Sequence, residues 1–148
     1  IFLLGASPGV AETLKQVMEA EYPGVQIVGT FVPPFRAVFS QEENEQMIQA
    51  INSVKPDILL VSLTAPKQDI WIAENLQKLG TKICIGIGGA FEVTAGLIPR
   101  APHWMQVNGL EWLYRFCNEP KRMFRRYFME APVFIPLILL QKLKSLFK

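Results

Sequence analysis

The chain has 148 residues, of which 50% are hydrophobic and 19% are charged. This composition excludes an intrinsically disordered protein, because disorder requires low hydrophobicity together with high net charge. The two cysteines, Cys84 and Cys117, are too few for a disulfide framework, so we expect a reduced, cytosolic compartment. The first residue is Ile rather than Met, and we therefore expect a piece of a longer protein.

Charge is distributed unevenly along the chain. Residues 1–114 contain seven Lys and Arg against eleven Asp and Glu, which gives a net charge of −4. Residues 115–148 contain eight Lys and Arg against two Glu, which gives a net charge of +6. An acidic body with a basic end indicates that this end meets an anionic partner: a phosphate ligand, a membrane surface or a nucleic acid.

Residues 1–87 alternate between apolar runs and amphipathic stretches. In chain order we expect a strand at 1–4, a helix from 8 to about 21, a strand at 25–31, a loop at 32–40, a helix at 41–54, a strand at 58–63, a helix at 67–79 and a strand at 82–87. Ser7 and Pro8 would supply the N-cap and the first turn of the first helix. Strands separated by single helices predict parallel, right-handed crossovers. The fold class is therefore α/β, a three-layer Rossmann-like parallel sheet of about four strands.

The pattern changes after residue 91. Short apolar pieces lead into an expected helix at 109–118, a basic segment at 121–127 and an apolar run at 131–140. We therefore predict two functional parts, an α/β ligand-binding domain at 1–108 and a helical, basic, amphipathic C-terminal appendage at 109–148.

Three loops follow strand ends in the predicted sheet, at 5–9, 64–68 and 88–92. In a doubly wound sheet, ligands bind outside the carboxyl ends of the strands, so these loops are the candidate site. The candidate binding residues are Gly5, Ser7, Gly9, Pro66, Lys67, Gln68, Gly88, Gly89, Phe91 and Glu92.

Each loop has a functional and a purely structural interpretation. The first leads into a helix N-terminus, which favours a phosphate but is equally consistent with a tight turn. Lys67 is suited to neutralising a diphosphate and Gln68 to hydrogen-bonding a sugar or phosphate oxygen, unless both lie in a solvated first helical turn. Glu92 is suited to accepting hydrogen bonds from a ribose or a base N–H, or else caps a short helix.

The sequence offers little support for metal chemistry. Its aspartates are Asp57 and Asp69, so it contains no Asp-x-Asp pair to hold Mg²⁺ or Mn²⁺ on a nucleotide diphosphate. His103 has no neighbouring ligand in sequence, and we expect it to pack or to lie at the surface. We expect no metal site and no cofactor.

The basic end has competing interpretations. Arg115, Arg122, Arg125 and Arg126 lie at helical spacings, which suits a diphosphate clamp, a contact with anionic lipid or a solvated helix face. The apolar residues that follow are too few for a membrane span, which needs roughly 20. They predict an interfacial helix or a helix docked on a partner.

Several ordered motifs resemble one family. The run APKQDIWI, followed by GIGGAFEVTAGLIPRAPHWMQVNGLEWLYRFCNEPKRMFRRY, is similar to the pattern of the WecG/TagA/CpsF family of bacterial glycosyltransferases. The opening LLGASPGVAE and the run YPGVQIVG also resemble this family, and the resemblance extends to about Tyr127. It implies transfer of an N-acetylmannosamine-type or related hexose from a UDP-sugar donor to a polyprenyl-diphosphate-linked acceptor. The products are bacterial cell-surface polysaccharides and teichoic acids.

The resemblance also implies how the reaction and its residues are arranged. Transfer is expected to be inverting and metal-independent, at the cytoplasmic face of the plasma membrane, with a peripheral anionic membrane contact and no nucleic acid. Domain 1–108 would bind the UDP-sugar through its glycine loops, with Glu92 near the uridine. The catalytic residues implied by the family motifs are Gln68, Arg115, Arg122 and Arg125.

The sequence departs from the family pattern in three residues and in length, and these departures leave an alternative function open. Asp69, Glu92 and Thr64 stand where the family has glutamate, aspartate and glycine, which affects the identity of the donor sugar more than the fold. Family members are longer at the N-terminus, where the acceptor motif and the proposed general base lie. The alternative to an enzyme is therefore a non-catalytic nucleotide-binding α/β module. A flavodoxin-like or dehydrogenase-like domain is disfavoured, because the first loop lacks GxGxxG.

Overall fold

A computed structural model describes residues 1–124, 128, 132, 136–138 and 140–142. The chain forms two compact units, Ile1–Pro99 and Arg100–Lys148. The first unit contains the sheet and the second contains helices. This division lies ahead of the predicted functional boundary at 108, which stays a prediction.

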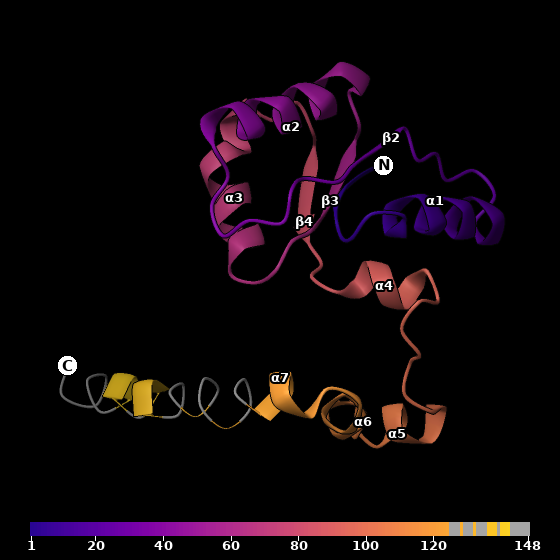
Figure 1. Cartoon of the computed structure of the whole chain (residues 1–148), viewed down its shortest axis with the longest axis vertical. Coiled ribbons are helices and arrows are strands. Elements are labelled where there is room, and N and C mark those ends of the chain that lie inside the picture. Colours follow the sequence, from indigo (N-terminus) through magenta and orange to yellow (C-terminus); the bar gives the residue numbers. More distant parts are fainter. Residues whose placement is uncertain (125–127, 129–131, 133–135, 139, 143–148) are drawn as a thin grey trace. The chain divides into compact units, whose positions relative to one another are not determined.

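The first unit is built on four parallel strands, in the order β2-β1-β3-β4. They are β1 (Phe2–Gly5), β2 (Gly29–Phe31), β3 (Ile58–Ser62) and β4 (Ile83–Gly86). Every pair of neighbours is parallel, with β1 paired to both β2 and β3. Figure 1 shows β3 and β4 side by side in this sheet. The predicted four-stranded α/β sheet is confirmed.

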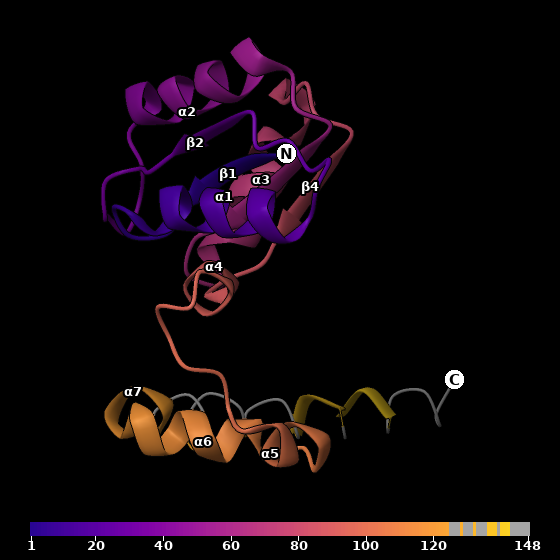
Figure 2. The same ribbon diagram turned by 90° about the vertical axis from the view of Figure 1, so that its right-hand side faces the viewer.

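Helices cover both faces of this sheet and give it three layers. On one face α1 (Val10–Glu21) and α4 (Ala90–Thr94) enclose a core around Leu3. On the other face α2 (Gln41–Val54) and α3 (Lys67–Asn75) enclose a core around Leu4. In Figure 2, α1 lies in front of the strands and α3 behind them. A strand that is buried on both faces must be apolar throughout, which is why β1 reads as a continuous hydrophobic run.

Helix α2 has the predicted bounds, and its first residues explain them. Ser40 is the N-cap, and its Oγ accepts a hydrogen bond from the Glu43 backbone N–H at 3.2 Å. The Glu43 carboxylate accepts one in return from the Ser40 N–H at 2.8 Å. This reciprocal capping box satisfies two backbone donors that the helix itself leaves unpaired.

Four other predicted bounds are wrong by a few residues. Helix α1 begins at Val10 and not at Pro8, because Gly9 has a φ of 85°, which is not helical, and Ser7 makes no side-chain cap. Strand β2 is only Gly29–Phe31, because its ladder with β1 begins opposite Phe2. Helix α3 ends at Asn75 and continues as a 3₁₀ turn, Leu76–Lys78. Strand β4 is shorter than 82–87 at both ends.

The second unit begins with three short helices. They are α5 (His103–Val107), α6 (Glu111–Asn118) and α7 (Pro120–Phe124). The helix expected at 109–118 is thus present from Glu111 onward. Of the basic segment at 121–127, residues 125–127 lie outside the described residues, as do residues 131, 133–135 and 139 of the apolar run at 131–140. Among the helices that the structure describes, none has the length and apolarity to cross a membrane.

A glycine at the end of β1 is required by both its conformation and its surroundings. Gly5 has a φ of +108°, and a Cβ at this position would collide with the backbone carbonyl of Ser62. Gly24 has nearly the same φ, +103°, but a Cβ there would meet no atom within 4 Å. Substitutions at Gly5 and Gly24 can therefore be compared to separate the energetic cost of backbone strain from that of steric collision.

We expect Gly5→Ala to lower the free energy of unfolding by more than about 3 kcal/mol, since strain and collision add. Gly24→Ala carries the strain alone and should cost about 1–2 kcal/mol. Urea denaturation followed by circular dichroism measures both. Equal losses in the two variants would show that the approach to Ser62 does not constrain Gly5.

Candidate functional site

The candidate site lies at the carboxyl ends of β1 and β3. From β1 the chain moves outward to β2, and it then returns to β3 on the opposite side of β1. The loop after β1 leads to α1 on one face, whereas the loop after β3 leads to α3 on the other. In open α/β sheets ligands bind in a crevice between loops that diverge in this way, so strand order assigns the candidate crevice to this point.

Ser62, the last residue of β3, joins the loops that surround this crevice. Its carbonyl accepts a hydrogen bond from the Ala6 N–H at 2.8 Å. Its hydroxyl donates to the Gly88 carbonyl at 2.6 Å. The loops after β1 and β4 are therefore both tied to the end of β3. Sequence analysis did not select Ser62, although a buried polar residue at the end of an apolar strand is a recognisable signal.

Gln68 is positioned by the third loop. It lies in the first turn of α3 and is 7% exposed. Its Oε1 accepts a hydrogen bond from the Gly88 N–H at 2.9 Å. A Cβ at Gly86 would lie 2.9 Å from the Gln68 Nε2, so a larger residue there would require the end of the Gln68 side chain to shift. The structure thus brings Gln68 and the glycine loop together, and their role in binding stays a prediction.

Glu92 carries an unpaired carboxylate oxygen beside the same loop. Its Oε2 is buried and has no hydrogen-bond partner among the residues that the structure describes. A Cβ at Gly89 would lie 3.8 Å from this oxygen. Buried polar atoms are nearly always hydrogen-bonded, so an acceptor without a donor indicates where a ligand hydroxyl or N–H can bind.

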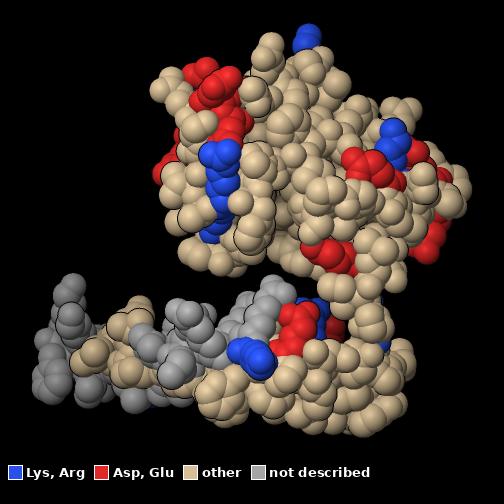
Figure 3. Space-filling view, in the orientation of Figure 1, with Lys and Arg blue, Asp and Glu red and all other residues tan. Residues whose placement is uncertain are grey.

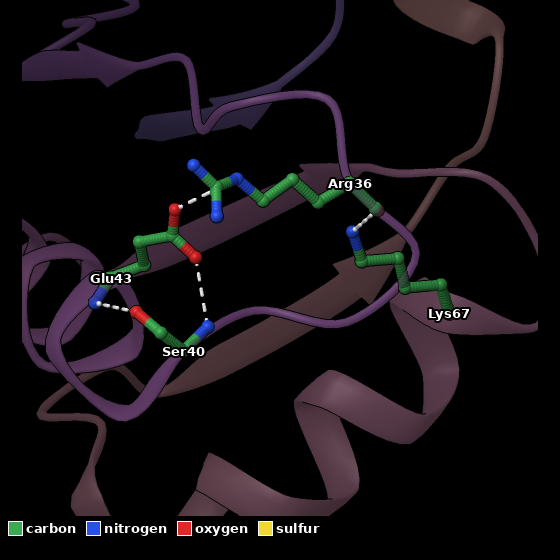
Figure 4. Close-up of polar contacts among 4 residues, drawn as sticks. All are labelled: Arg36, Ser40, Glu43 and Lys67. Atoms are coloured by element: carbon green, nitrogen blue, oxygen red, sulfur yellow. Dashed lines mark hydrogen bonds and ion pairs between the residues drawn. The ribbon is translucent and has the colours of Figure 1, made fainter.

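Phe91 and Lys67 have partners within the protein. Phe91 is 0% exposed and packs in the core between the sheet, α1 and α4, where it anchors the turn that carries Glu92. The Lys67 ammonium donates to the Arg36 carbonyl at 2.5 Å (Figure 4). It also lies 3.4 Å from the centroid of the Phe39 ring. Burial lowers the pKa of the Lys67 amine, and the Glu43 carboxylate opposes this shift.

The first loop is open to solvent at the start of α1. Ser7 and Gly9 are exposed, and the Ser7 carbonyl accepts from the Val10 N–H at 3.1 Å. A Cβ at Gly9 would meet no atom within 4 Å, so this turn has room for a ligand. Pro66 is the N-cap of α3 and is exposed. These positions fit the predicted phosphate contact, which stays a prediction.

The predicted catalytic arginines belong to the second unit. Arg115 lies in α6 and forms an ion pair with Glu111 at 3.2 Å, one helical turn away. Arg122 lies in α7, and Arg125 lies outside the described residues. Their predicted contact with a diphosphate therefore remains a prediction.

Charge on the first unit is arranged in mixed groups. On the face shown in Figure 3, some basic side chains lie beside acidic ones, whereas other charged side chains lie apart on uncharged surface. One such pair is Arg36 with Glu43, at 3.2 Å. Within the described part of the chain, no three His, Cys, Asp or Glu side chains gather in a way that suits a metal ion.

A family model provides the deciding comparison. The model of the Glycosyl transferase WecG/TagA/CpsF family matches residues 1–148. The chain belongs to this family. The resemblance found in the sequence motifs is therefore confirmed over the whole length.

The chain is also similar to curated relatives from Staphylococcus aureus. It is 31% identical over 135 residues to an N-acetylglucosaminyldiphosphoundecaprenol N-acetyl-beta-D-mannosaminyltransferase of strain MRSA252. Proteins of the same name in strains MW2 and NCTC 8325 / PS 47 are each 30% identical over 135 residues. In each case the match covers 91% of this chain and 50% of the relative, so the chain spans about half the length of these proteins.

Proposed function

We propose that this chain is the donor-binding part of a glycosyltransferase and that it binds a UDP-sugar in the crevice between β1 and β3. The observation that carries the proposal is the buried Glu92 Oε2, which lacks a hydrogen-bond donor among the described residues. A ribose hydroxyl or the uracil N–H would supply that donor. Family membership supports a glycosyl donor as the ligand.

The diphosphate is proposed to lie near the exposed loop that precedes α1. The backbone N–H groups of the first helical turn and the helix dipole attract negative charge at this position. Arg115, Arg122 and Arg125 are the proposed cations that offset the charge on the departing UDP. Gln68, which is held by Gly88, is proposed to face the transferred hexose.

The proposed reaction is an inverting displacement at C1 of an N-acetylmannosamine-type or related hexose. The acceptor hydroxyl oxygen bonds to C1 as the bond from C1 to the phosphate oxygen breaks, and UDP leaves with the electron pair. A general base outside this chain would take the hydroxyl proton. The relatives' name, which contains a diphosphoundecaprenol-linked sugar, supports a polyprenyl-diphosphate-linked acceptor. No metal ion is required in this scheme, because arginines and helix dipoles supply the positive charge.

A second candidate is a nucleotide-binding module without catalysis. It is favoured by one observation, that the chain spans about half the length of its curated relatives. Both candidates bind UDP, and only the first transfers a sugar.

The basic end is proposed to hold the protein on the cytoplasmic face of a bacterial membrane, as a peripheral contact. Its described residues include several large apolar side chains that are roughly half exposed, namely Phe128, Leu137, Ile138 and Leu140. Apolar side chains alternating with lysines suit the interface of an anionic bilayer.

The proposed role of Glu92 is tested by UDP binding. We expect Glu92→Ala to weaken UDP binding by about 1–3 kcal/mol, because the hydrogen bond from the ligand is lost. Isothermal titration with UDP in the presence of EDTA measures the affinity and also shows that binding needs no metal ion. Glu74→Ala, at an exposed position on α3, is the matched control and should bind like the unaltered chain. Equal affinity in the Glu92 and Glu74 variants would contradict the assignment.

Membrane contact by the basic end is tested by vesicle flotation. Removing residues 131–148 takes away three lysines and most of the apolar run, so binding to anionic vesicles should fall by about tenfold or more. High salt should weaken the binding of the intact chain. If the intact chain does not float with anionic vesicles at low salt, the basic end is a packing element and not a membrane contact.

A further inference from the structure

The loop between β2 and α2, residues 32–40, is anchored at both ends and exposed in the middle. Pro33 is buried, and Phe39 packs against the core on the α2 side of the sheet. The five residues between them are all exposed. Two of these carry large apolar side chains, Phe35, which is 99% exposed, and Val38, which is 81% exposed.

A network of polar contacts fixes the backbone of this exposed segment. The Lys67 ammonium reaches across from α3 to the Arg36 carbonyl and lies over the Phe39 ring. The Arg36 guanidinium pairs with Glu43, which also caps α2 through Ser40 (Figure 4). Phe35 and Val38 are therefore exposed on a loop that these contacts hold in place and that has two prolines near its start, Pro33 and Pro34.

The loop lies at the end of the sheet formed by the carboxyl ends of the strands, which is also where the candidate site lies. It starts at the carboxyl end of β2 and contacts Lys67, which follows β3. Because β1 lies between β2 and β3, the loop passes the carboxyl end of β1 and borders the crevice on the α2 side. Lys67 is also the immediate neighbour of Gln68, so one helical turn holds both the loop and a proposed site residue.

We propose that loop 32–40 inserts Phe35 and Val38 into the interfacial layer of a lipid bilayer and so turns the crevice toward the membrane. The inference rests on the proposed function, in which a lipid-linked acceptor has to reach the UDP-sugar at the carboxyl ends of the strands. Single exposed apolar residues need no explanation. Phe35 and Val38, however, lie on one segment that polar contacts hold in place, close to where a lipid-linked substrate would bind. Together they present the apolar area that an interfacial contact buries.

Tryptophan fluorescence at the loop tip tests the proposal. Trp104 and Trp112 are first changed to Phe, which leaves only the buried Trp71 as background. Phe35→Trp then reports on the loop itself, independently of any membrane contact by the basic end. Tyr22→Trp is the matched control, since Tyr22 is 55% exposed and follows α1 at the opposite edge of the sheet. Vesicles contain phosphatidylglycerol and brominated phosphatidylcholine, which quenches inserted tryptophan.

We expect the Phe35→Trp chain to shift its emission to shorter wavelength and to be quenched about threefold more than the Tyr22→Trp chain. In the unaltered background, Phe35→Ser should lower the vesicle partition coefficient by about tenfold, whereas Tyr22→Ser should leave it unchanged. Equal quenching of the two tryptophan variants, or the absence of vesicle binding, would overturn the proposal.

The readout also separates this inference from the proposed function. Loop insertion requires neither UDP nor a transferred sugar, so Glu92→Ala should insert as the unaltered chain does. Failure of UDP binding with intact insertion would therefore overturn the proposed function alone. Intact UDP binding without insertion would overturn the loop proposal alone.

Discussion

The end of strand β3 is the point on which the candidate site depends. Ser62 accepts a hydrogen bond from the loop after β1 and donates one to the loop after β4. The loop after β1 can approach Ser62 because the residue beside it is Gly5, where a Cβ would collide with the Ser62 carbonyl. In the loop after β4, Gly88 adopts a φ of +55°. These hydrogen bonds tie the three loops to one another, and we call the three loops together the rim of the site.

This rim determines which side chains face the crevice. Gly88 uses its carbonyl for Ser62 and its N–H for Gln68, which fixes the start of α3 against β4. The core residue Phe91 then holds the turn that places Glu92 beside Gly89. The unpaired Glu92 oxygen is the consequence, a desolvated acceptor in a site whose backbone is already ordered. Such preorganisation lowers the entropy lost when a ligand binds.

Much of this arrangement could be predicted from local sequence, and the remainder could not. The alternation of apolar runs with amphipathic stretches predicts the parallel sheet, and the motifs around Gln68 and Glu92 predict the family. The start of α1 was wrong because the positive φ of Gly9 overrides the capping preference of Ser7. The contacts of Lys67 with Arg36 and Phe39 depend on a loop that passes β1, which no local pattern encodes. The role of Ser62 similarly depends on strand order.

The most direct test of the central claim is a crystal structure of this chain with UDP bound. The account predicts that UDP lies across the carboxyl ends of β1 and β3, with the Glu92 carboxylate accepting a hydrogen bond from the ribose or the uracil. The diphosphate should lie at the start of α1 or beside the arginines of the second unit. UDP bound at the opposite edge of the sheet, or bound with Glu92 Oε2 still unpaired, would contradict the account.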